Sequence, residues 1–373
     1  MNIVKLKVIP VLLCISMLFF NFFYINVSAG EINVDAKCAV ALDSKTKAVL
    51  YEKNSQMIVP MASTTKIITA LVAINYGNLD KKVEISEKAA NIKGSTVGYK
   101  KGEMISIREL VFGLMLRSGN DAAIAISEGI AGSTEEFVKL MNEYAHIIGI
   151  CSTHFESPHG LDSDYHYSTA YDLALATAKA KELPLFNEIV STKDIEAEKY
   201  GFSRSYHNIN KILWQLDDAD GVKTGSTGKA GKCLVTSVNI DDNSIIIVVL
   251  NSNGRWKETK KIHDYVVKNY EYKKVISKDT LVAEMPIGDS KNKIKLSCNE
   301  DIIIPVRKNA AINIKTVFPS SDIKLPIKKG DKIGSLYIYD GDNKLLFTHY
   351  LEAKNGVADK NKIKVPFFKF NKN

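Results

Sequence analysis

Residues 60–74 read Pro-Met-Ala-Ser-Thr-Thr-Lys-Ile-Ile-Thr-Ala-Leu-Val-Ala-Ile, a short polar segment followed by an apolar run. The run from Ile67 to Ile74 predicts a helix that is mostly buried in a protein core. Positions i and i+3 of a helix share one face, so Lys66 would place its amine beside the hydroxyl of Ser63. This arrangement puts a base next to a nucleophile.

A lysine acts as a base only when its surroundings lower its pKa, because the free side chain is protonated at neutral pH. The apolar residues after Lys66 supply burial and Lys223 could supply a second cation, and both lower the pKa of an amine. An isolated Ser-x-x-Lys is most often an N-capping serine followed by a solvated lysine. The same spacing begins at four serines that sit among charges and turn formers: Ser44, Ser226, Ser290 and Ser321.

A second motif, Ser118-Gly119-Asn120, lies between two apolar segments at 110–116 and 122–130. Its position predicts a short polar loop that joins two helices and lines a cleft. Ser118 could relay a proton to a leaving amine there, and Asn120 could hold a substrate amide. An ordinary helix–helix turn is the alternative interpretation, since Ser-x-Asn also occurs at Ser237 and Ser297.

The third motif, Lys223-Thr224-Gly225, occurs once and precedes a predicted hairpin whose arms span 233–239 and 244–250. A lysine on a sheet edge, beside a glycine that lets another backbone approach, suits binding of an extended peptide and its carboxylate. A solvated edge lysine that discourages aggregation is the alternative.

The three motifs together, in this order and each in a suitable local structure, are far more specific than any one of them. The chain resembles the low-molecular-mass penicillin-binding proteins of the D-alanyl-D-alanine carboxypeptidase family. The resemblance extends over most of the chain after its first 29 residues. Further similar stretches are 39–43, 131–133, 141–142, 159–162, 168–172, 221–225 and 230–231.

The resemblance implies a role for each motif. Ser63 would be acylated with Lys66 as its base, and Ser118 and Asn120 would form the second element of the cleft. Lys223 and Thr224 would cradle the substrate carboxylate beside Gly225. The backbone amides of Ser63 and Ser226 would form the oxyanion hole.

Arg255 lies where the family has an arginine that assists carboxylate recognition. A solvated charge at the start of a helix opened by Arg255-Trp256 is an equally good interpretation. The predicted site is therefore catalytic Ser63, Lys66 and Ser118, with substrate-binding Asn120, Lys223, Thr224, Gly225, Ser226 and Arg255. No metal ion and no cofactor are expected.

The implied activity is that of a serine-type carboxypeptidase. It removes the terminal D-alanine of peptidoglycan stem pentapeptides during cell-wall biosynthesis and is inhibited by β-lactams. A serine β-lactamase is one alternative, but it usually carries Glu-x-x-Leu-Asn, and in Glu182-Leu183-Pro184-Leu185-Phe186-Asn187 the asparagine is one place too far. A non-catalytic β-lactam sensor or wall-binding protein is another, and retention of every chemical motif argues against it.

With 373 residues the chain can form one large core and a second domain. Predicted strands at 38–42, 48–52 and 221–250 flank a helical middle from residue 64 to about residue 180, and a helix is expected at 257–270. This order predicts an α+β fold in which one antiparallel sheet is covered by helices, as in β-lactamases and DD-peptidases. Short β-rich runs after about residue 275 predict a small all-β domain.

The N-terminus reads as a signal peptide, with Lys5 and Lys7 before an apolar run at 8–24 and small residues at 27–29. An uncleaved anchor is the rival interpretation, but the run is short for a bilayer and Asn21 interrupts it. The expected division is a signal peptide at 1–29, a penicillin-recognising catalytic domain at 30–272, a β-rich domain at 273–358 and a basic, aromatic tail at 359–373. The mature protein would work outside the cytoplasm.

A net charge of +8 allows attraction to anionic wall polymers or lipid headgroups, or serves plain solubility. Aromatic residues and lysines in the 359–373 tail could touch a membrane surface weakly, and no nucleic-acid partner is expected. The cysteines have no metal-binding spacing, so Cys38, Cys151, Cys233 and Cys298 are interpreted as buried free thiols, with a disulfide left open.

Overall fold

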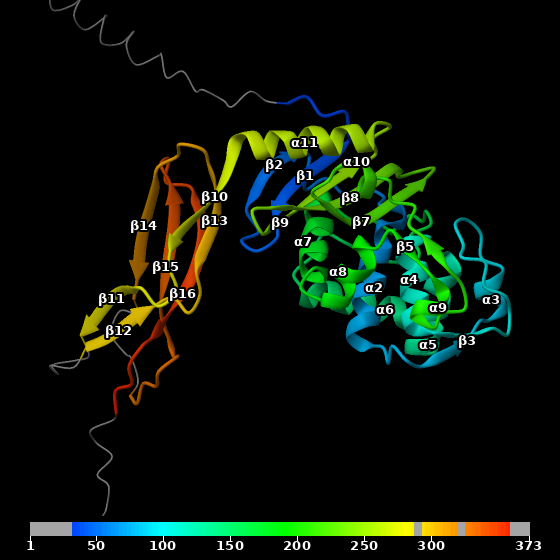
Figure 1. The fold of residues 1–373 in the computed structure, drawn as a ribbon, viewed down its shortest axis with the longest axis horizontal. Helices are drawn as coiled ribbons and strands as arrows, with labels where there is room; N and C mark the ends of the chain where they lie inside the picture. The colour runs from blue at the N-terminus through cyan, green and yellow to red at the C-terminus, as the bar shows by residue number, and fades with distance from the viewer. Residues whose placement is uncertain (1–31, 287–292, 319–324, 359–373) are drawn as a thin grey trace, which may run out of the picture. The chain divides into compact units, whose positions relative to one another are not determined.

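The computed structural model describes residues 32–286, 293–318 and 325–358, and Figure 1 traces them. A five-stranded antiparallel sheet, ordered β2-β1-β9-β8-β7, forms the centre of the larger domain. Its strands are β1 (Cys38–Asp43), β2 (Val49–Lys53), β7 (Ala219–Thr227), β8 (Gly231–Ile240) and β9 (Asn243–Leu250). The sheet joins segments that are distant in the sequence, as predicted, and β7 forms one of its edges.

Helices cover both faces of this sheet. The helix α11 (Arg255–Asn269) lies along one face, while α7 (Ala170–Ala180) and α8 (Pro184–Ser191) lie on the other (Figure 1). Covering both faces explains why β9 is apolar without alternation, since every residue from Ile245 to Leu250 is buried. Asp241 and Asp242 have φ values of 49° and 61° in the turn before β9, which is the geometry of a tight hairpin between right-twisted strands.

A helical lobe follows β2 and is built around α2. The elements of the lobe are η1 (Ala62–Thr65), α2 (Lys66–Tyr76), α3 (Glu87–Ala90), α4 (Ile107–Leu116), α5 (Asn120–Ala131), α6 (Thr134–Ile147) and α9 (Ala197–Tyr200), while α10 (Ile212–Gln215) lies against β7. Every residue of α2 from Lys66 to Ala73 is buried, so this part of the helix is surrounded by protein on all sides. Its burial sets the environment of the lysine at its first position.

Two small strand pairs were not predicted, one within the helical middle expected at 64–180 and one between that region and the strands expected from residue 221. They are β3 (Lys82–Glu84) with β4 (Met104–Ser106), and β5 (Asp194–Ile195) with β6 (Tyr206–His207). Strands this short bury little surface and carry no periodic pattern, which is why the sequence did not reveal them. The helix expected at 257–270 begins earlier, at Arg255, and ends at Asn269.

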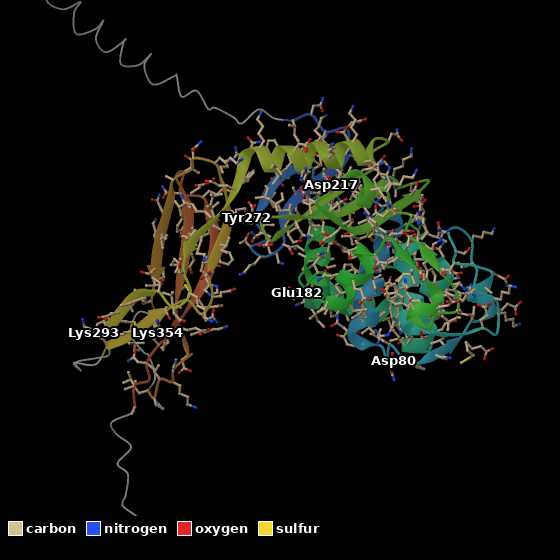
Figure 2. All side chains as sticks on the ribbon, in the orientation of Figure 1. Asp80, Glu182, Asp217, Tyr272, Lys293 and Lys354 are labelled. Atoms are coloured by element: carbon tan, nitrogen blue, oxygen red, sulfur yellow. The ribbon has the colours of Figure 1, made fainter. Side chains whose placement is uncertain are left out.

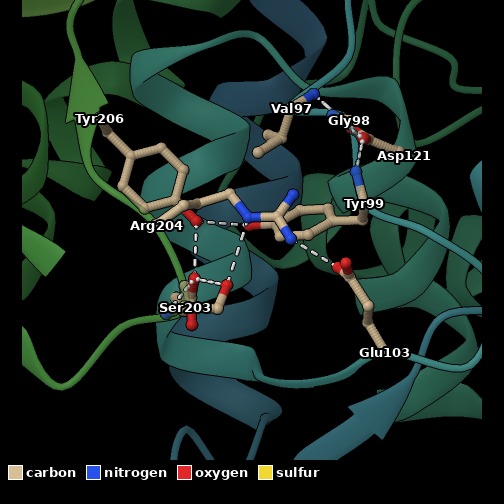
Figure 3. A network of polar contacts seen from close by, with 9 residues as sticks. Val97, Gly98, Tyr99, Glu103, Asp121, Ser203, Arg204 and Tyr206 are labelled. Atoms are coloured by element: carbon tan, nitrogen blue, oxygen red, sulfur yellow. Dashed lines mark hydrogen bonds and ion pairs between the residues drawn. The ribbon is translucent and has the colours of Figure 1, made fainter.

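A buried carboxylate joins the β5–β6 segment to α4. Glu109 is 4% exposed and accepts hydrogen bonds from the Ser203 amide at 2.9 Å, the Ser203 hydroxyl at 2.6 Å and the Tyr206 hydroxyl at 2.9 Å. In Figure 3 the neighbouring Arg204 lies against the Tyr99 ring, 4.4 Å from its centroid, and reaches Glu103. These contacts hold the segment between β5 and β6 against the helical lobe.

The C-terminal domain has its own sheet and core. The strands are β10 (Tyr270–Ile276), β11 (Leu281–Pro286), β12 (Lys293–Ser297), β13 (Ile302–Arg307), β14 (Ile312–Val317), β15 (Lys332–Asp340) and β16 (Leu345–Ala353). Five of them form a sheet ordered β11-β12-β16-β15-β14 around buried Ile294, Leu296, Leu336, Ile338 and Leu351. The all-β character was predicted, although β10 begins before residue 275, where the β-rich runs were expected to start.

The structure contradicts the prediction for one cysteine. Cys38, Cys233 and Cys298 are buried free thiols as expected, but Cys151 is exposed because it follows the C-terminal turn of α6 at the surface. The predicted signal peptide at 1–29 and the tail at 359–373 lie outside the described residues. Within the described ranges, no helix combines the length and the apolarity needed to cross a membrane.

We predict that Glu109→Ala lowers the free energy of unfolding by about 2 kcal/mol, because it removes the acceptor of the buried Tyr206 hydroxyl and of the exposed Ser203 amide and hydroxyl. Urea unfolding followed by circular dichroism measures this change. The matched control is Glu136→Ala, since the Glu136 side chain is 56% exposed and its ion pair with Lys139 contributes little. Equal losses in the two variants would contradict the assignment.

Candidate active site

Ser63 lies in η1, one turn before the fully buried part of α2. The residue before it, Ala62, has a φ of 51°, a left-handed conformation that costs energy for a residue with a side chain. Thr64 donates its hydroxyl hydrogen to the Met61 carbonyl at 2.6 Å and so holds the start of the turn. The Ser63 side chain is half-buried and therefore accessible to a ligand.

Lys66 is the centre of the polar contacts at this site. Its Nζ lies 2.8 Å from Ser63 Oγ, 2.7 Å from Asn120 Oδ1 and 2.8 Å from the carbonyl oxygen of His159. The side chain has no exposed surface. Three polar atoms from three separate segments of the chain therefore surround one buried amine.

Burial, together with the nearby charge of Lys223, holds the pKa of the Lys66 amine well below its usual range. A neutral amine has two hydrogens and one lone pair. The hydrogens can go to Asn120 Oδ1 and the His159 carbonyl, which leaves the lone pair free to accept the Ser63 hydroxyl hydrogen. The geometry thus provides a base already aligned with its nucleophile.

The second motif sits between α4 and α5, in the expected helix–helix loop. Ser118 is buried and has a φ of 59°. Asn120 begins α5 and is held on both sides, since its Nδ2 donates to the Lys93 carbonyl at 2.7 Å while its Oδ1 faces Lys66. Asn120 thereby ties the loop at 93–95 to Lys66.

The third motif lies on β7, the sheet edge that faces η1. Gly225 allows a very close approach, because a Cβ at this position would lie 3.0 Å from the Ser63 amide nitrogen. Lys223 is 1% exposed and donates to the Thr224 carbonyl at 2.9 Å. Burial and the charge of Arg255 lower the pKa of Lys223 to about 7. Thr224 is buried and Ser226 is exposed.

Arg255 begins α11 and lies against the back of the same strand. Its Nη1 donates to the Gly225 carbonyl at 2.8 Å and to the Cys233 carbonyl at 3.0 Å, so it ties β7 to β8. Its Nε is buried without a protein partner. The guanidinium also stacks on Trp256, 4.7 Å from the ring centroid. Arg255 is thus not a freely solvated charge at a helix start.

Some residues of the site could not be identified from the sequence. His159 contributes its main-chain oxygen to Lys66, and a backbone acceptor has no side-chain signature. The His159 imidazole is kept neutral because burial and the nearby Lys66 lower its pKa to about 3. Asp121, next to the second motif, was also not singled out.

Asp121 fastens the loop at 97–99 to the start of α5, as Figure 3 shows. Its carboxylate is 2% exposed and accepts hydrogen bonds from the amides of Val97 at 3.0 Å, Gly98 at 2.8 Å and Tyr99 at 3.2 Å. Tyr99 continues the network through its hydroxyl, 2.7 Å from that of Tyr206. The loop beside Asn120 is consequently held by one buried anion.

Comparison with known proteins identifies relatives over most of the chain. A family profile described as D-alanyl-D-alanine carboxypeptidase matches residues 25–254, and one described as the C-terminal domain of penicillin-binding protein 5 matches residues 270–359. D-alanyl-D-alanine carboxypeptidase DacF of Bacillus subtilis is 35% identical over 83% of this chain and 82% of its own length. DacC of Escherichia coli is 32% identical over 82% of this chain and 80% of its own.

Solved structures agree with the sequence matches. Penicillin-binding protein 5 from Haemophilus influenzae superposes with a TM-score of 0.77 at 30% identity, covering 88% of this chain and 99% of its own. A peptidoglycan synthesis regulatory factor (PBP3) from Streptococcus pneumoniae superposes with a TM-score of 0.75 at 25% identity, covering 87% of this chain and 100% of its own.

Replacing Asp121 tests its hold on the loop. We expect Asp121→Ala to lower the free energy of unfolding by about 3 kcal/mol and Asp121→Asn to lower it by about half as much, because Asn keeps one acceptor oxygen. Urea unfolding gives these values, and hydrogen exchange of the Val97, Gly98 and Tyr99 amides reports the loop itself. Asp80→Ala is the control, since the Asp80 side chain, labelled in Figure 2, is 83% exposed. Unchanged exchange in Asp121→Ala would refute the role.

Proposed function

The chain belongs to the D-alanyl-D-alanine carboxypeptidase family of penicillin-binding proteins, and from this premise we propose that it works through an acyl-enzyme on Ser63. The substrate is the stem pentapeptide of peptidoglycan, from which the terminal D-alanine is released. The observation that carries the proposal is the 2.8 Å contact between Ser63 Oγ and the fully buried amine of Lys66.

Acylation begins when Ser63 Oγ attacks the carbonyl carbon of the penultimate D-alanine. The hydroxyl hydrogen passes to the lone pair of Lys66, and a bond forms between Oγ and the carbon. The negative charge on the carbonyl oxygen is stabilised by the backbone amides of Ser63 and Ser226. Each such donor contributes roughly 3 to 4 kcal/mol to transition-state stabilisation.

Collapse of this intermediate breaks the peptide C–N bond. The leaving amine of D-alanine takes up the proton from Lys66 through the Ser118 hydroxyl, and the product departs as the free amino acid. Water then hydrolyses the ester on Ser63 and restores the hydroxyl. A β-lactam acylates Ser63 by the same first step, which accounts for inhibition when hydrolysis of its ester is slow.

Substrate binding uses the open edge of β7. An extended peptide can pair with this edge through main-chain hydrogen bonds, while Asn120 holds a substrate amide from the opposite wall. The terminal carboxylate lies near Lys223 and the Thr224 hydroxyl, and Arg255 adds positive charge from behind the strand. The Gly225 position without a side chain keeps the passage between β7 and η1 open.

We also propose that the protein acts outside the cytoplasm, with 1–29 as a signal peptide and 30–272 as the catalytic domain. The separate hydrophobic core of the β-rich region supports a second domain at 273–358. The tail at 359–373 would touch a membrane surface peripherally. This location suits an enzyme whose polymeric substrate is assembled outside the cell membrane.

A serine β-lactamase would need a carboxylate that activates water in the site. The candidate from the sequence, Glu182, is instead paired with Lys179 at 2.6 Å, and its side chain is 54% exposed (labelled in Figure 2). A non-catalytic sensor would differ in lacking turnover, because acylation of its serine by a β-lactam needs the same base. Both alternatives are separated from the carboxypeptidase by one experiment.

Incubation of the protein lacking residues 1–29 with diacetyl-lysyl-D-Ala-D-Ala should release D-alanine, and Ser63→Ala should abolish the release. Penicillin should add one mass equivalent on Ser63 in the unaltered protein and none in the variant. A matched control is Ser226→Ala, which keeps its backbone amide and therefore most of the activity. Rapid penicillin turnover without D-alanine release would indicate a β-lactamase, and neither activity would indicate a sensor.

The pH dependence of kcat/KM should depend on both lysines, because deprotonation of Lys66 should raise kcat/KM and deprotonation of Lys223 should lower it. Lys66 must be neutral and Lys223 protonated, so kcat/KM should fall above pH about 7, where Lys223 loses its proton. The fall should be absent from kcat, because bound carboxylate keeps Lys223 charged. Lys223→Arg should shift the alkaline fall upward by more than two pH units, since a guanidinium stays protonated. An unshifted fall in this variant would contradict the assignment to Lys223.

A further inference from the structure

A buried hydrogen-bonded chain leads from His166 to the peptide bond that carries the Ser63 amide. His166 Nδ1 lies 3.0 Å from the Glu156 amide nitrogen, and its Nε2 lies 2.8 Å from Thr65 Oγ1. Thr65 Oγ1 in turn lies 2.8 Å from the carbonyl oxygen of Ala62. His166, Thr65 and Ala62 are each at most 3% exposed.

The direction of this chain is fixed by its two ends. The Glu156 amide can only donate, so His166 Nδ1 accepts and the ring hydrogen sits on Nε2. That hydrogen is donated to Thr65 Oγ1, and the hydroxyl hydrogen of Thr65 then goes to the Ala62 carbonyl. Burial lowers the pKa of His166 to about 4, which keeps the ring neutral and in this tautomer at neutral pH.

The Ala62 carbonyl and the Ser63 amide belong to one peptide group. In a trans peptide the oxygen and the hydrogen point in opposite directions, so a bond that holds the oxygen also aims the N–H. The Ser63 nitrogen faces the groove beside β7, because a Cβ on Gly225 would lie 3.0 Å from it. Donation into the carbonyl also polarises the peptide and strengthens its N–H as a donor.

Two further features indicate that this peptide group has to be held in place. The φ of 51° at Ala62 is costly and persists only where surrounding contacts determine it. Gly160 packs so tightly here that an added Cβ would lie 2.1 Å from the Ala62 oxygen and 2.6 Å from Thr65 Oγ1. The site has room for the Thr65 hydroxyl and for little else.

We propose that His166, acting through the Thr65 hydroxyl, is a positioning residue that aims the Ser63 amide at the developing oxyanion. The inference rests on the proposed function, because it matters only if Ser63 is the acylated nucleophile. Neither side chain touches the substrate. The alternative is simple packing, since the His166 ring also lies edge-to-face on Phe155 at 5.9 Å.

The test compares Thr65→Val, which removes the hydroxyl, with Thr65→Ser, which keeps it. We expect Thr65→Val to lower kcat for D-alanine release and the rate of penicillin acylation about tenfold, a part of the loss seen when an oxyanion donor is removed outright. KM should change little, because ground-state binding does not use the oxyanion bond. Thr65→Ser should restore most of the rate.

The neighbouring threonine supplies a matched control. Thr64 is equally buried and also donates its hydroxyl to a carbonyl three residues earlier, but that carbonyl belongs to the Met61–Ala62 peptide. Thr64→Val should therefore leave kcat within about twofold, since it does not touch the peptide of the oxyanion donor. Equal kcat losses in Thr64→Val and Thr65→Val would overturn the proposal.

His166→Phe and His166→Gln complete the design. Gln can accept from Glu156 and donate to Thr65, so it should retain more activity than Phe. The effect of His166→Phe should largely vanish in the Thr65→Val background, because both act on one chain of bonds. Fully additive effects would indicate packing alone and overturn the proposal. If Thr65→Val does not fold, the comparison of Phe with Gln at position 166 decides the question.

The amount of penicillin adduct gives the number of active molecules in each preparation. Rates of D-alanine release are divided by this number, so partial unfolding of a variant does not lower its measured rate. The proposed function and this inference fail in different ways. Absence of D-alanine release by the unaltered protein, or release that survives Ser63→Ala, would reject the function. Normal release with equal rates in Thr65→Val and Thr65→Ser would reject only the positioning role.

Discussion

The rest of the site depends on one contact, in which the amine of Lys66, without solvent exposure, lies 2.8 Å from the hydroxyl of Ser63. Burial is the main reason that the pKa of Lys66 is lowered, and the second cation at Lys223 adds to it. A helix covered on all sides is needed to bury an amine so completely, which explains why the helical lobe is built around α2. The same burial would be costly without partners, and Asn120 Oδ1 and the His159 carbonyl supply them.

The second requirement is that the sheet and the lobe meet closely. β7 can approach η1 because Gly225 has no side chain, and the distance of 3.0 Å from its missing Cβ to the Ser63 nitrogen leaves no margin for another residue. Left-handed conformations occur at Ala62 in η1 and at Ser118 in the loop before α5. Such conformations are stable only where neighbouring bonds enforce them. Thr65 bonds to the Ala62 carbonyl, Asp121 holds the loop beside Asn120, and Arg255 ties β7 to β8. Thr65 and Asp121, which lie outside the predicted site, thus hold the main chain around its residues.

The α+β class, the sheet assembled from both ends of the larger domain and the all-β second domain were predictable, because apolar runs and turn signals are local properties. The contact between Ser63 and Lys66 was also predictable from local sequence, because residues three apart on a helix share one face. Short strands such as β3 and β5 escaped prediction because they are too brief to carry a period. Cys151 was misjudged as buried, because its exposure depends on where the chain turns after α6 and not on its neighbours in sequence.

The sequence by itself determined the chemical groups and their order: a nucleophile with an amine one turn later, an amide-bearing loop and an edge-strand lysine beside glycine. It could do so because each motif is complete within three or four residues. Only the tertiary structure decided that the His159 carbonyl would face Lys66, that Arg255 would hold two strand carbonyls, and that His166 would reach Thr65. Those contacts join residues far apart in the chain, and main-chain atoms, which are the same at every position, supply several of the partners.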